Sequence, residues 1–516
     1  MNRLGFPLLS ILILVPFAGA LVTLAVGRSR RTAWLWALVV SLAALALAGA
    51  VWGLFDYGRG GPESLAGSMQ FVDRVPWIET LGISYYVGVD GISLWLLLLT
   101  TFLVPIAIVA SWRLVSHWPV EDVRAYFFWL LALETGVLGV FAAVDLVLFF
   151  VFWEAMLVPA YFLIGRWGGE RRMYATLKFF LYTMAGSALM LVAILVLAAL
   201  GFQQTGELTF DLLALNDLSL GFDVQIWLFL AFALAFAVKA PVWPFHGWLP
   251  PAYVESPTPV TILLAGILSK MGIYGLIRFC IPLFPDALAV ARPWIWPLVV
   301  VGIVYASLVA LVQSDMKRLI AYSSMAHVGI IVAGVLAANV QGVQGALLQS
   351  VSHGITVSAL FLIVEFLAVR RGTSQIETFG GLWQSMPLLG TLTLTVMMAS
   401  IGLPGLSGFP GEFTLLLGLF RQSPVAAAVA ATGIVLGAWY TLSLFRRVFA
   451  GPIERPENRT LPDLRRREGL LLLPLVVLIF VLGILPGLVL RATDTAVADL
   501  LTVAEENHAV LVESDK

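Results

Sequence analysis

The segment Ala235–Pro250, AFAVKAPVWPFHGWLP, brings a lysine and several prolines to the end of an apolar run that begins near Ile226. Lys239 ends the run, and Pro241 and Pro244 break it. A broken helix leaves backbone groups without partners, so in hydrocarbon such breaks persist only where they line a polar or wet cavity inside a protein. The segment therefore predicts a discontinuous membrane helix with a cation beside its break.

The composition of the whole chain is typical of a polytopic membrane protein. The 516 residues are 60% hydrophobic and 12% charged, and the mean hydropathy is +0.96, whereas a soluble protein is about 25% charged. Apolar stretches of about 20 residues, long enough to cross a bilayer as helices, recur along the chain, so we predict an all-α fold with about fourteen transmembrane helices. The single cysteine, Cys280, excludes a disulfide framework and a thiolate cluster.

Basic and acidic loops alternate along the sequence. Lys and Arg in short loops stay on the cytoplasmic side of a membrane. The basic loops follow the first, third and fifth spans and recur later, with the densest patch at 446–467, while acidic segments at 202–224 and 491–516 fall on the other side. This pattern predicts a multi-pass protein with both termini non-cytoplasmic, and we expect it in a bacterial or archaeal inner membrane.

Two proline-broken spans lie at corresponding positions of two blocks of five spans. They are VKAPVWPFHGWLPP, with Pro241, and GLPGLSGFPGEF, with Pro404. Because five is odd, the second block must be inverted relative to the first, which is a pattern of secondary transporters. The predicted divisions are N-terminal helices one to three at 1–125, a first five-helix repeat at 126–280, a second, inverted repeat at 293–450, and a loop, last helix and polar tail at 451–516.

Six titratable side chains lie inside apolar spans or at their breaks: Glu154, Lys239, Lys270, His327, His353 and Glu412. A lysine or carboxylate at the centre of a span costs about 2.5–3.5 kcal/mol. Lysine, glutamate and histidine in a partly wet channel can exchange protons near neutral pH, with histidine as the natural intermediary. The series predicts a proton relay. Glu134 is also intramembrane, but no neighbouring residue assigns it a role.

A structural role is the alternative for each of these side chains. Glu154 and Lys239 would form a static ion pair, and Lys270 would extend to an interface. The two membrane histidines would be hydrogen-bonded core residues, and Glu412 would cap the second half of its broken helix. His246, which follows Pro244, is expected to bond freed backbone groups rather than a metal.

The sequence lacks the motifs of a nucleotide or redox site. We find no GxGxxG, no GKS or GKT loop and no paired nucleophile and base, and neither a carboxylate cage nor a metal triad at helical spacing. We therefore expect no cofactor and no metal in this chain, and no nucleic-acid partner. The energy for transport must come from a partner or from an ion gradient.

Five blocks carry a resemblance to a known family: FVFWEAMLVPAYFLIG, AFAVKAPVWPFHGWLP, ILLAGILSKMGIYGLIRF, DMKRLIAYSSMAHVG and GFPGEFTLLLG. In this order they resemble the antiporter-like membrane subunits of NADH:quinone oxidoreductase, respiratory complex I. The block GVDGISLWLLLLTTFLVP and the acid at the second break are similar to the subunit M or chain 4 type. The L-type relative ends in a long lateral helix, which this chain is expected to lack.

The resemblance implies fourteen helices, with two inverted five-helix bundles that each hold a half-channel. Glu154 would pair with Lys239 as the switch. Lys270, His327 and His353 would form the central relay. Glu412 would serve the outer exit. As a subunit of a proton-translocating enzyme, the chain would couple electron transfer in partner subunits to pumping. Those partners would hold FMN, iron–sulfur clusters and quinone, and neighbouring antiporter-like subunits and lipid would surround the chain.

Two other functions remain open. A D-type subunit of a multisubunit Na⁺/H⁺ antiporter shares the first three members of the series, although lysine is commoner than glutamate at the position of Glu412. A small-molecule carrier would need a pocket with ligand-specific groups. The chain also departs from the family at Gly247, Pro251 and Tyr253, where Thr, Asp and His are usual. The electron donor is open as well, because NADH, ferredoxin and F420 arms use similar membrane subunits.

Overall fold

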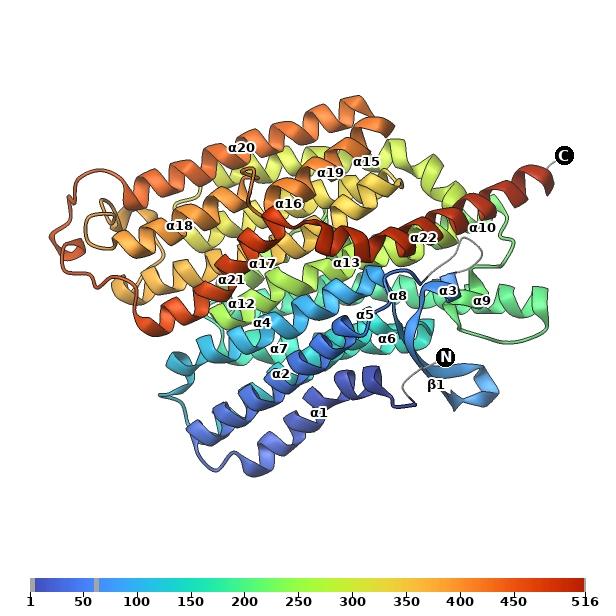
Figure 1. Cartoon of the computed structure of the whole chain (residues 1–516), viewed down its shortest axis with the longest axis horizontal. Helices are drawn as coiled ribbons and strands as arrows, with labels where there is room; N and C mark the ends of the chain where they lie inside the picture. Colours follow the sequence, from blue (N-terminus) through green and yellow to red (C-terminus); the bar gives the residue numbers. More distant parts are fainter. Residues whose placement is uncertain (1–4, 60–64, 515–516) are drawn as a thin grey trace. The chain divides into compact units, whose positions relative to one another are not determined.

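The computed structural model describes residues 5–59 and 65–514, and most of them form helices (Figure 1). In this part of the chain, 13 helical segments are long and apolar enough to cross a membrane. The shorter apolar helix α18 (Pro387–Ser400) and, after a break, α19 (Gly408–Gln422) together form a broken fourteenth. The all-α polytopic fold predicted from the sequence is confirmed.

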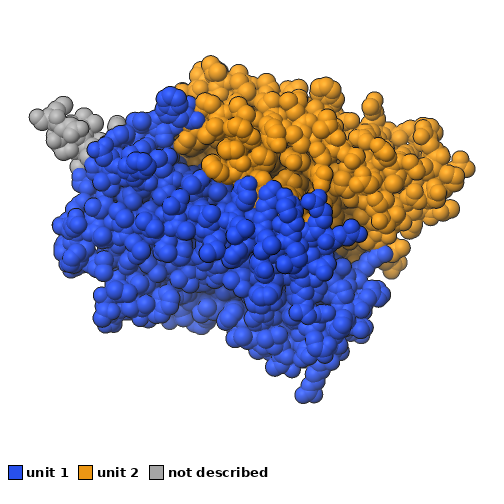
Figure 2. Space-filling model, turned by 180° about the vertical axis from the view of Figure 1, so that it is seen from behind, with its two compact units in different colours: residues 1–240, 270–294, 490–516 blue, residues 241–269, 295–489 orange. Residues whose placement is uncertain are grey.

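The chain divides into two compact units, coloured separately in Figure 2. Unit 1 comprises Met1–Ala240, Lys270–Trp294 and Leu490–Lys516, and unit 2 comprises Pro241–Ser269 and Ile295–Val489. Each unit has its own buried apolar core, and each is described by itself below.

In unit 1 the first four long helices pack side by side (Figure 1). The kink between α6 and α7 divides the next span, and two π-helical turns interrupt the span that contains α13. The elements are α1 (Leu8–Val26), α2 (Arg30–Gly53), α3 (Leu65–Ser68), β1 (Gln70–Ile78), η1 (Glu79–Leu81), β2 (Ile83–Val89), α4 (Gly91–Val115), α5 (Val120–Ala142), α6 (Leu146–Ala155), α7 (Leu157–Trp167), α8 (Arg172–Thr205), α9 (Leu212–Leu215), α10 (Phe222–Lys239), α13 (Ser269–Gly275), η3 (Leu276–Cys280), α14 (Ile281–Leu283) and α22 (Gly487–Ser514).

The antiparallel hairpin of β1 and β2 was not predicted from the sequence. Its turn contains Gly82, whose φ of 65° is unfavourable for other residues. A Cβ at this position would lie 1.8 Å from the carbonyl oxygen of Leu208, so only glycine fits. Arg74 of β1 forms a 3.0 Å ion pair with Asp211, which ties the hairpin to the segment before α9.

A buried ion pair holds the start of α4 against η3. Nη2 of Arg278 lies 2.6 Å from Oδ1 of Asp90, and both side chains are at most 1% exposed. Asp90 also caps α4 by accepting from the backbone amides of Ile92 and Ser93, and Arg278 donates to the hydroxyl of Tyr274. Removing one partner of a buried pair costs about 3–5 kcal/mol, so this pair fixes how the two helices meet.

In unit 2, α17 lies at the centre of the bundle and packs against α16, α18, α19 and α21 (Figure 1). The elements are α11 (Leu249–Glu255), α12 (Thr258–Leu263), η2 (Leu264–Leu268), α15 (Pro285–Leu311, which begins in unit 1), α16 (Met316–Leu336), α17 (Val340–Arg371), η4 (Ile376–Thr378), α18, α19, α20 (Pro424–Phe449), η5 (Pro456–Asn458) and α21 (Arg466–Ile484).

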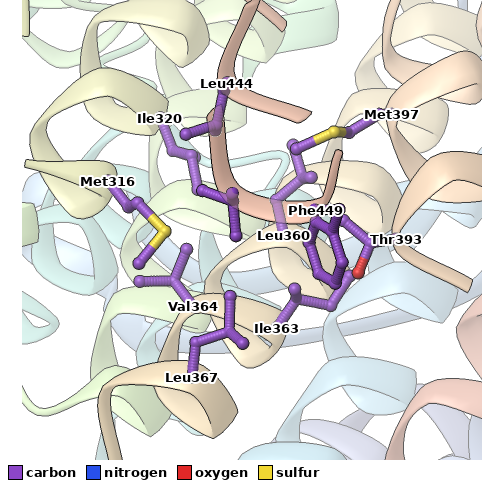
Figure 3. Close-up of a pocket in the computed structure, with 11 residues that line it drawn as sticks. Met316, Ile320, Leu360, Ile363, Val364, Leu367, Thr393, Met397, Leu444 and Phe449 are labelled. Atoms are coloured by element: carbon purple, nitrogen blue, oxygen red, sulfur yellow. The ribbon is translucent and has the colours of Figure 1, made fainter. Parts of the chain in front are cut away.

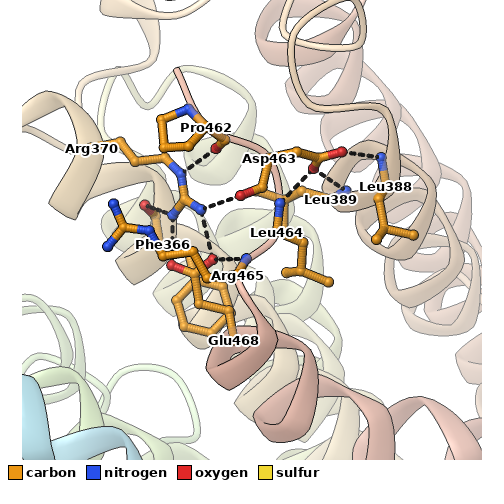
Figure 4. Close-up of polar contacts among 9 residues, drawn as sticks. All are labelled: Phe366, Arg370, Leu388, Leu389, Pro462, Asp463, Leu464, Arg465 and Glu468. Atoms are coloured by element: carbon orange, nitrogen blue, oxygen red, sulfur yellow. Dashed lines mark hydrogen bonds and ion pairs between the residues drawn. The ribbon is translucent and has the colours of Figure 1, made fainter. Parts of the chain in front are cut away.

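The basic segment between α20 and α21 is anchored by one arginine (Figure 4). Arg370, at the end of α17, donates to both carboxylate oxygens of Glu468 at 2.8 and 2.6 Å. It also donates to the carbonyl oxygens of Pro462 and Asp463. The Asp463 carboxylate accepts from the first amides of α18, so the segment is folded onto three helices rather than free.

We predict that Arg370→Met opens this segment. The change leaves a buried carboxylate without its cation, which costs about 3–5 kcal/mol. The rate of trypsin cleavage after Arg459 and Arg465 in membrane vesicles should rise, whereas Arg446→Met, at an exposed arginine, should leave it unchanged. Equal cleavage rates in the two variants would show that Arg370 does not anchor the segment.

Candidate proton-transfer site

Lys239 is the last residue of α10, at the first predicted break. Its side chain is 1% exposed. Nζ lies 3.5 Å from the sulfur of Met156 and 5.5 and 5.4 Å from the ring centres of Trp153 and Phe179. Aromatic faces attract cations, and a thioether is only a weak acceptor. Unit 1 therefore surrounds the lysine with weakly polar groups.

Glu154 lies on α6, two residues before the kink at Met156. It is half-buried and interacts electrostatically with Lys239. Its Oε1 is buried without a hydrogen-bond partner. The two predicted partners thus lie within electrostatic reach, while Met156 and Trp153, from the same turn of the chain, directly contact the lysine.

Lys270 lies on α13 between two π-helical turns, η2 and η3. Its side chain is fully buried, as is the whole apolar window of this span. The span approaches α10 closely at Gly272, where a Cβ would lie 2.6 Å from the amide nitrogen of Ala240. Single π turns inside α-helices occur frequently at functional sites. The lysine is therefore deep in the protein and not at an exposed end of its helix.

Unit 2 gathers three predicted side chains from three helices. Nε2 of His327 (α16) lies 3.8 Å from Oε1 of Glu412 (α19), and the rings of His327 and His353 (α17) stack with centres 5.6 Å apart. Gln349, one turn before His353, donates to Oε1 of Glu412 at 2.9 Å. All four side chains are buried, so they form one polar cluster inside the bundle, the unit 2 cluster.

The hydrogen bonds of His327 fit a protonated ring. Nδ1 lies 2.8 Å from the carbonyl oxygen of Ser323, and Nε2 lies 2.8 Å from that of Ser400. A carbonyl oxygen only accepts, so both nitrogens are placed to donate, and only the imidazolium form carries two N–H groups. Ser400 ends α18, and the carbonyls at a helix C-terminus favour a cation. The second break therefore creates a site for a positively charged histidine beside Glu412.

Close helix packing positions Glu412. A Cβ on Gly345 of α17 would lie 2.2 Å from the amide nitrogen of Leu415, and a Cβ on Gly411 would lie 2.7 Å from Oε1 of Gln349. Only glycine allows α17 and α19 to approach so closely. The Glu412 carboxylate accepts from Gln349, and no side chain caps the start of α19. The capping alternative is therefore not the geometry observed.

Other polar features of unit 2 have structural partners. The ring of His246 packs edge-on against Tyr305, with centres 5.3 Å apart. Tyr253, at one of the positions that depart from the family, donates to the carbonyl oxygen of Leu264. Among residues 5–59 and 65–514, no group of three or more His, Cys, Asp or Glu could hold a metal ion.

An apolar pocket lies between α16, α17, α18 and α20 (Figure 3). None of the side chains that line it is titratable, so this pocket, unlike the unit 2 cluster, has no group that can carry a proton. The lining residues are Met316, Ile320, Leu360, Ile363, Val364, Leu367, Thr393, Met397, Leu444, Val448 and Phe449.

Sequence reasoning did not identify the side chains that surround the predicted ones. Trp153 and Met156 flank Glu154 within one helical turn, and Gln349 precedes His353 by one turn, so helical spacing could have pointed to all three. Phe179 comes from another helix, α8, and gave no local signal. The six predicted residues themselves divide evenly, with Glu154, Lys239 and Lys270 in unit 1 and the others in unit 2.

Fold and site together define a polytopic α-helical membrane protein with titratable groups buried near interruptions of its helices. The family model described as NADH:quinone oxidoreductase/Mrp antiporter, TM, matches residues 143–437, and the model for the amino terminus of NADH-ubiquinone oxidoreductase chain 4 matches residues 66–138. NADH-quinone oxidoreductase subunit M of Rhodobacter capsulatus is 43% identical over 96% of each chain.

Solved structures agree with this assignment. A chain of respiratory complex I from Thermus thermophilus with bound NADH has a TM-score of 0.84 and 32% identity, covering 96% of this chain and 99% of the other. A chain of the Mrp complex from Dietzia sp. has a TM-score of 0.80 at 24% identity, covering 98% and 99%, and supports the fold alone. This chain belongs to the antiporter-like membrane subunits of NADH:quinone oxidoreductase, of the subunit M or chain 4 type.

We predict that Gly345→Ala separates α17 from α19 and disrupts the unit 2 cluster. The new methyl group would meet the backbone of Leu415, and overpacking of this kind costs about 1–3 kcal/mol or more. Gly437→Ala is the matched control, because the nearest atom to its Cβ is 3.5 Å away. The midpoint of thermal unfolding in detergent should fall for Gly345→Ala only, and an equal effect of both changes would contradict the packing argument.

Proposed function

We propose that this chain translocates protons as a membrane subunit of an NADH:quinone oxidoreductase and couples electron transfer in partner subunits to pumping. The observation that carries the proposal is the burial of Lys239 at a helix break and of Lys270 between π turns, together with the burial of His327 and Glu412 beside the break after α18. Each of these groups can exchange a proton without a cofactor. The chain is thus the translocating part of an enzyme whose redox chemistry occurs elsewhere.

In the first step, Glu154 acts as a switch for Lys239. A nearby carboxylate favours the protonated lysine, and its withdrawal favours release of the proton. The contacts of Nζ support this role, because two ring faces and a thioether replace the hydration of an ammonium only weakly. The released proton passes to Lys270.

In the later steps, His327 and His353 carry the central relay with Lys270, and Glu412 serves the outer exit. The stacked rings and the 3.8 Å separation of His327 from Glu412 support these roles, because a proton can move between an imidazole and a nearby carboxylate. Gln349 orients the carboxylate by donating to it. Because a carbonyl of α18 binds His327, movement of the break would change how tightly the proton is held.

We further propose that 126–280 and 293–450 are inverted repeats, each providing one half-channel, with 1–125 and 451–516 as flanking segments. The breaks after Lys239 and Ser400 support this division, because matched discontinuous helices mark such repeats. The alternation of basic and acidic loops supports an orientation with both termini non-cytoplasmic, and the membrane we propose is a bacterial or archaeal inner membrane.

The partners are neighbouring antiporter-like subunits, with FMN, iron–sulfur clusters and quinone held in other subunits of the complex. Half-buried Glu154 supports contact with a neighbour, since Val151 and Val158 beside it are exposed apolar residues. A D-type subunit of a Na⁺/H⁺ antiporter is the second candidate, because the matching family model also covers Mrp antiporters and the Mrp chain shares the fold. Flavin and iron–sulfur chains that co-purify with this one would decide for the oxidoreductase, and small membrane subunits alone for the antiporter.

Removing the switch should abolish coupled transport. We predict that Lys239→Ala and Glu154→Ala each lower NADH-driven proton uptake by at least about tenfold, the loss expected when a positioned proton carrier is removed, while the complex still assembles. The measurement is quenching of a ΔpH-sensitive dye in inverted vesicles, normalised to assembled complex. Uptake near the wild-type level in either variant would exclude the switch.

Glu412 offers a sharper comparison. We predict that Glu412→Gln impairs pumping as much as Glu412→Ala, because glutamine keeps the oxygen and the volume but cannot exchange a proton. The same dye assay distinguishes the two roles. Normal pumping by the glutamine variant would show that Glu412 only holds the helices together.

A further inference from the structure

Glu134, near the middle of α5, is a buried acid outside the site described so far. Its side chain is 1% exposed, and neither carboxyl oxygen has a hydrogen-bond partner. An isolated ionised carboxylate in an apolar interior is far more costly than a neutral one. In this conformation the carboxyl group therefore keeps its proton.

The face of α5 that carries Glu134 is directed away from the Glu154 segment. Gly136 faces the kink between α6 and α7, since a Cβ there would lie 2.7 Å from Cβ of Met156. Each residue turns an α-helix by about 100°, so Glu134 lies about 160° away from Gly136. Phe141, seven residues later, lies within about 20° of Glu134 and marks the same face.

That face is directed to the span of Lys270. Tyr274 donates its hydroxyl to the carbonyl oxygen of Phe141 at 3.3 Å, and their rings meet edge-on with centres 5.4 Å apart. Lys270 is one turn before Tyr274 and shares its face, whereas Gly272, which packs on α10, lies on the opposite face.

The depths of the two groups also match. The spans of α5 and α13 are the fourth and the eighth along the chain, so they cross in the same direction if successive spans alternate. Glu134 precedes Phe141 by two turns and Lys270 precedes Tyr274 by one, which leaves a difference in depth of about 5 Å. Arg278, further along the same span, is paired with Asp90, and Lys270 is the other basic residue of the span 258–283.

We propose that Glu134 is a second proton-binding site of unit 1 that exchanges its proton with Lys270. The proton leaves the carboxyl group as the lysine amine becomes an ammonium, so a neutral pair becomes an ion pair and the net charge of the interior does not change. The exchange reaches Lys270 from the face opposite α10, the helix of Lys239. This inference rests on the proposed function and adds a carrier to it.

The test compares Glu134→Gln with Glu134→Asp in assembled complex in inverted vesicles, by NADH-driven dye quenching normalised to complex content. Glutamine keeps the volume and neutrality of the protonated acid but cannot release a proton, whereas aspartate is shorter but titratable. We expect pumping to fall at least about tenfold in Glu134→Gln and to be partly retained in Glu134→Asp. A packing role gives the reverse order, because aspartate leaves a cavity.

Two further variants keep the result unambiguous. Glu134→Leu is a second neutral replacement, and wild-type pumping per assembled complex in either neutral variant overturns the proposal. Thr135→Val, at the neighbouring buried hydroxyl, should pump normally. Lys239→Ala is measured in parallel. If it loses pumping while Glu134→Gln does not, only the role of Glu134 is overturned, and if both pump normally, the proposed function fails as well.

Discussion

The constraint on which this structure depends is the cost of placing an ammonium group in an apolar interior. The idealised penalty for burying such an ion is of order 20 kcal/mol, and several kcal/mol remain after relaxation. Around Lys239 the protein offsets this only in part, with two ring faces and a sulfur. This weak compensation is the physical basis for the proposed switch, in which the proton occupancy of Lys239 depends on the position of Glu154. The break at the end of α10 lies beside this lysine. Its unpaired backbone groups and the ammonium group both require polar surroundings inside the protein.

Unit 2 meets the same constraint by another route. There the group placed to carry a charge is His327, whose two ring nitrogens lie against backbone carbonyls and whose ring lies beside the Glu412 carboxylate. One of those carbonyls is available only because α18 ends at Ser400. The glycines of α17 and α19 then bring Glu412 within reach. Breaks and glycines, which weaken a helix on their own, are here the means by which charge is buried.

The sequence predicted the spans, both breaks and the placement of the six titratable groups within helical spans or at their breaks, because hydropathy, proline and charge are local signals. It could not predict the hairpin of β1 and β2 or the partnership of Asp90 with Arg278, 188 residues apart, because these depend on which helices become neighbours. The π turns around Lys270 were missed for the same reason, since tertiary packing rather than sequence periodicity selects them. The transport roles of the six residues remain predictions.

The free energy needed to move a proton against the membrane potential explains why such a chain needs partner subunits. Moving one proton against 100 mV takes about 2.3 kcal/mol. Two unit charges 4 Å apart attract by about 4 kcal/mol at an effective dielectric constant of about 20, and doubling their separation removes about 2 kcal/mol. In the proposed mechanism, a change in the separation of Glu154 and Lys239 would supply a free energy of this order, and the work of that change would come from a partner subunit. Since Glu154 is half-buried beside exposed apolar residues, a neighbouring subunit is in a position to impose it.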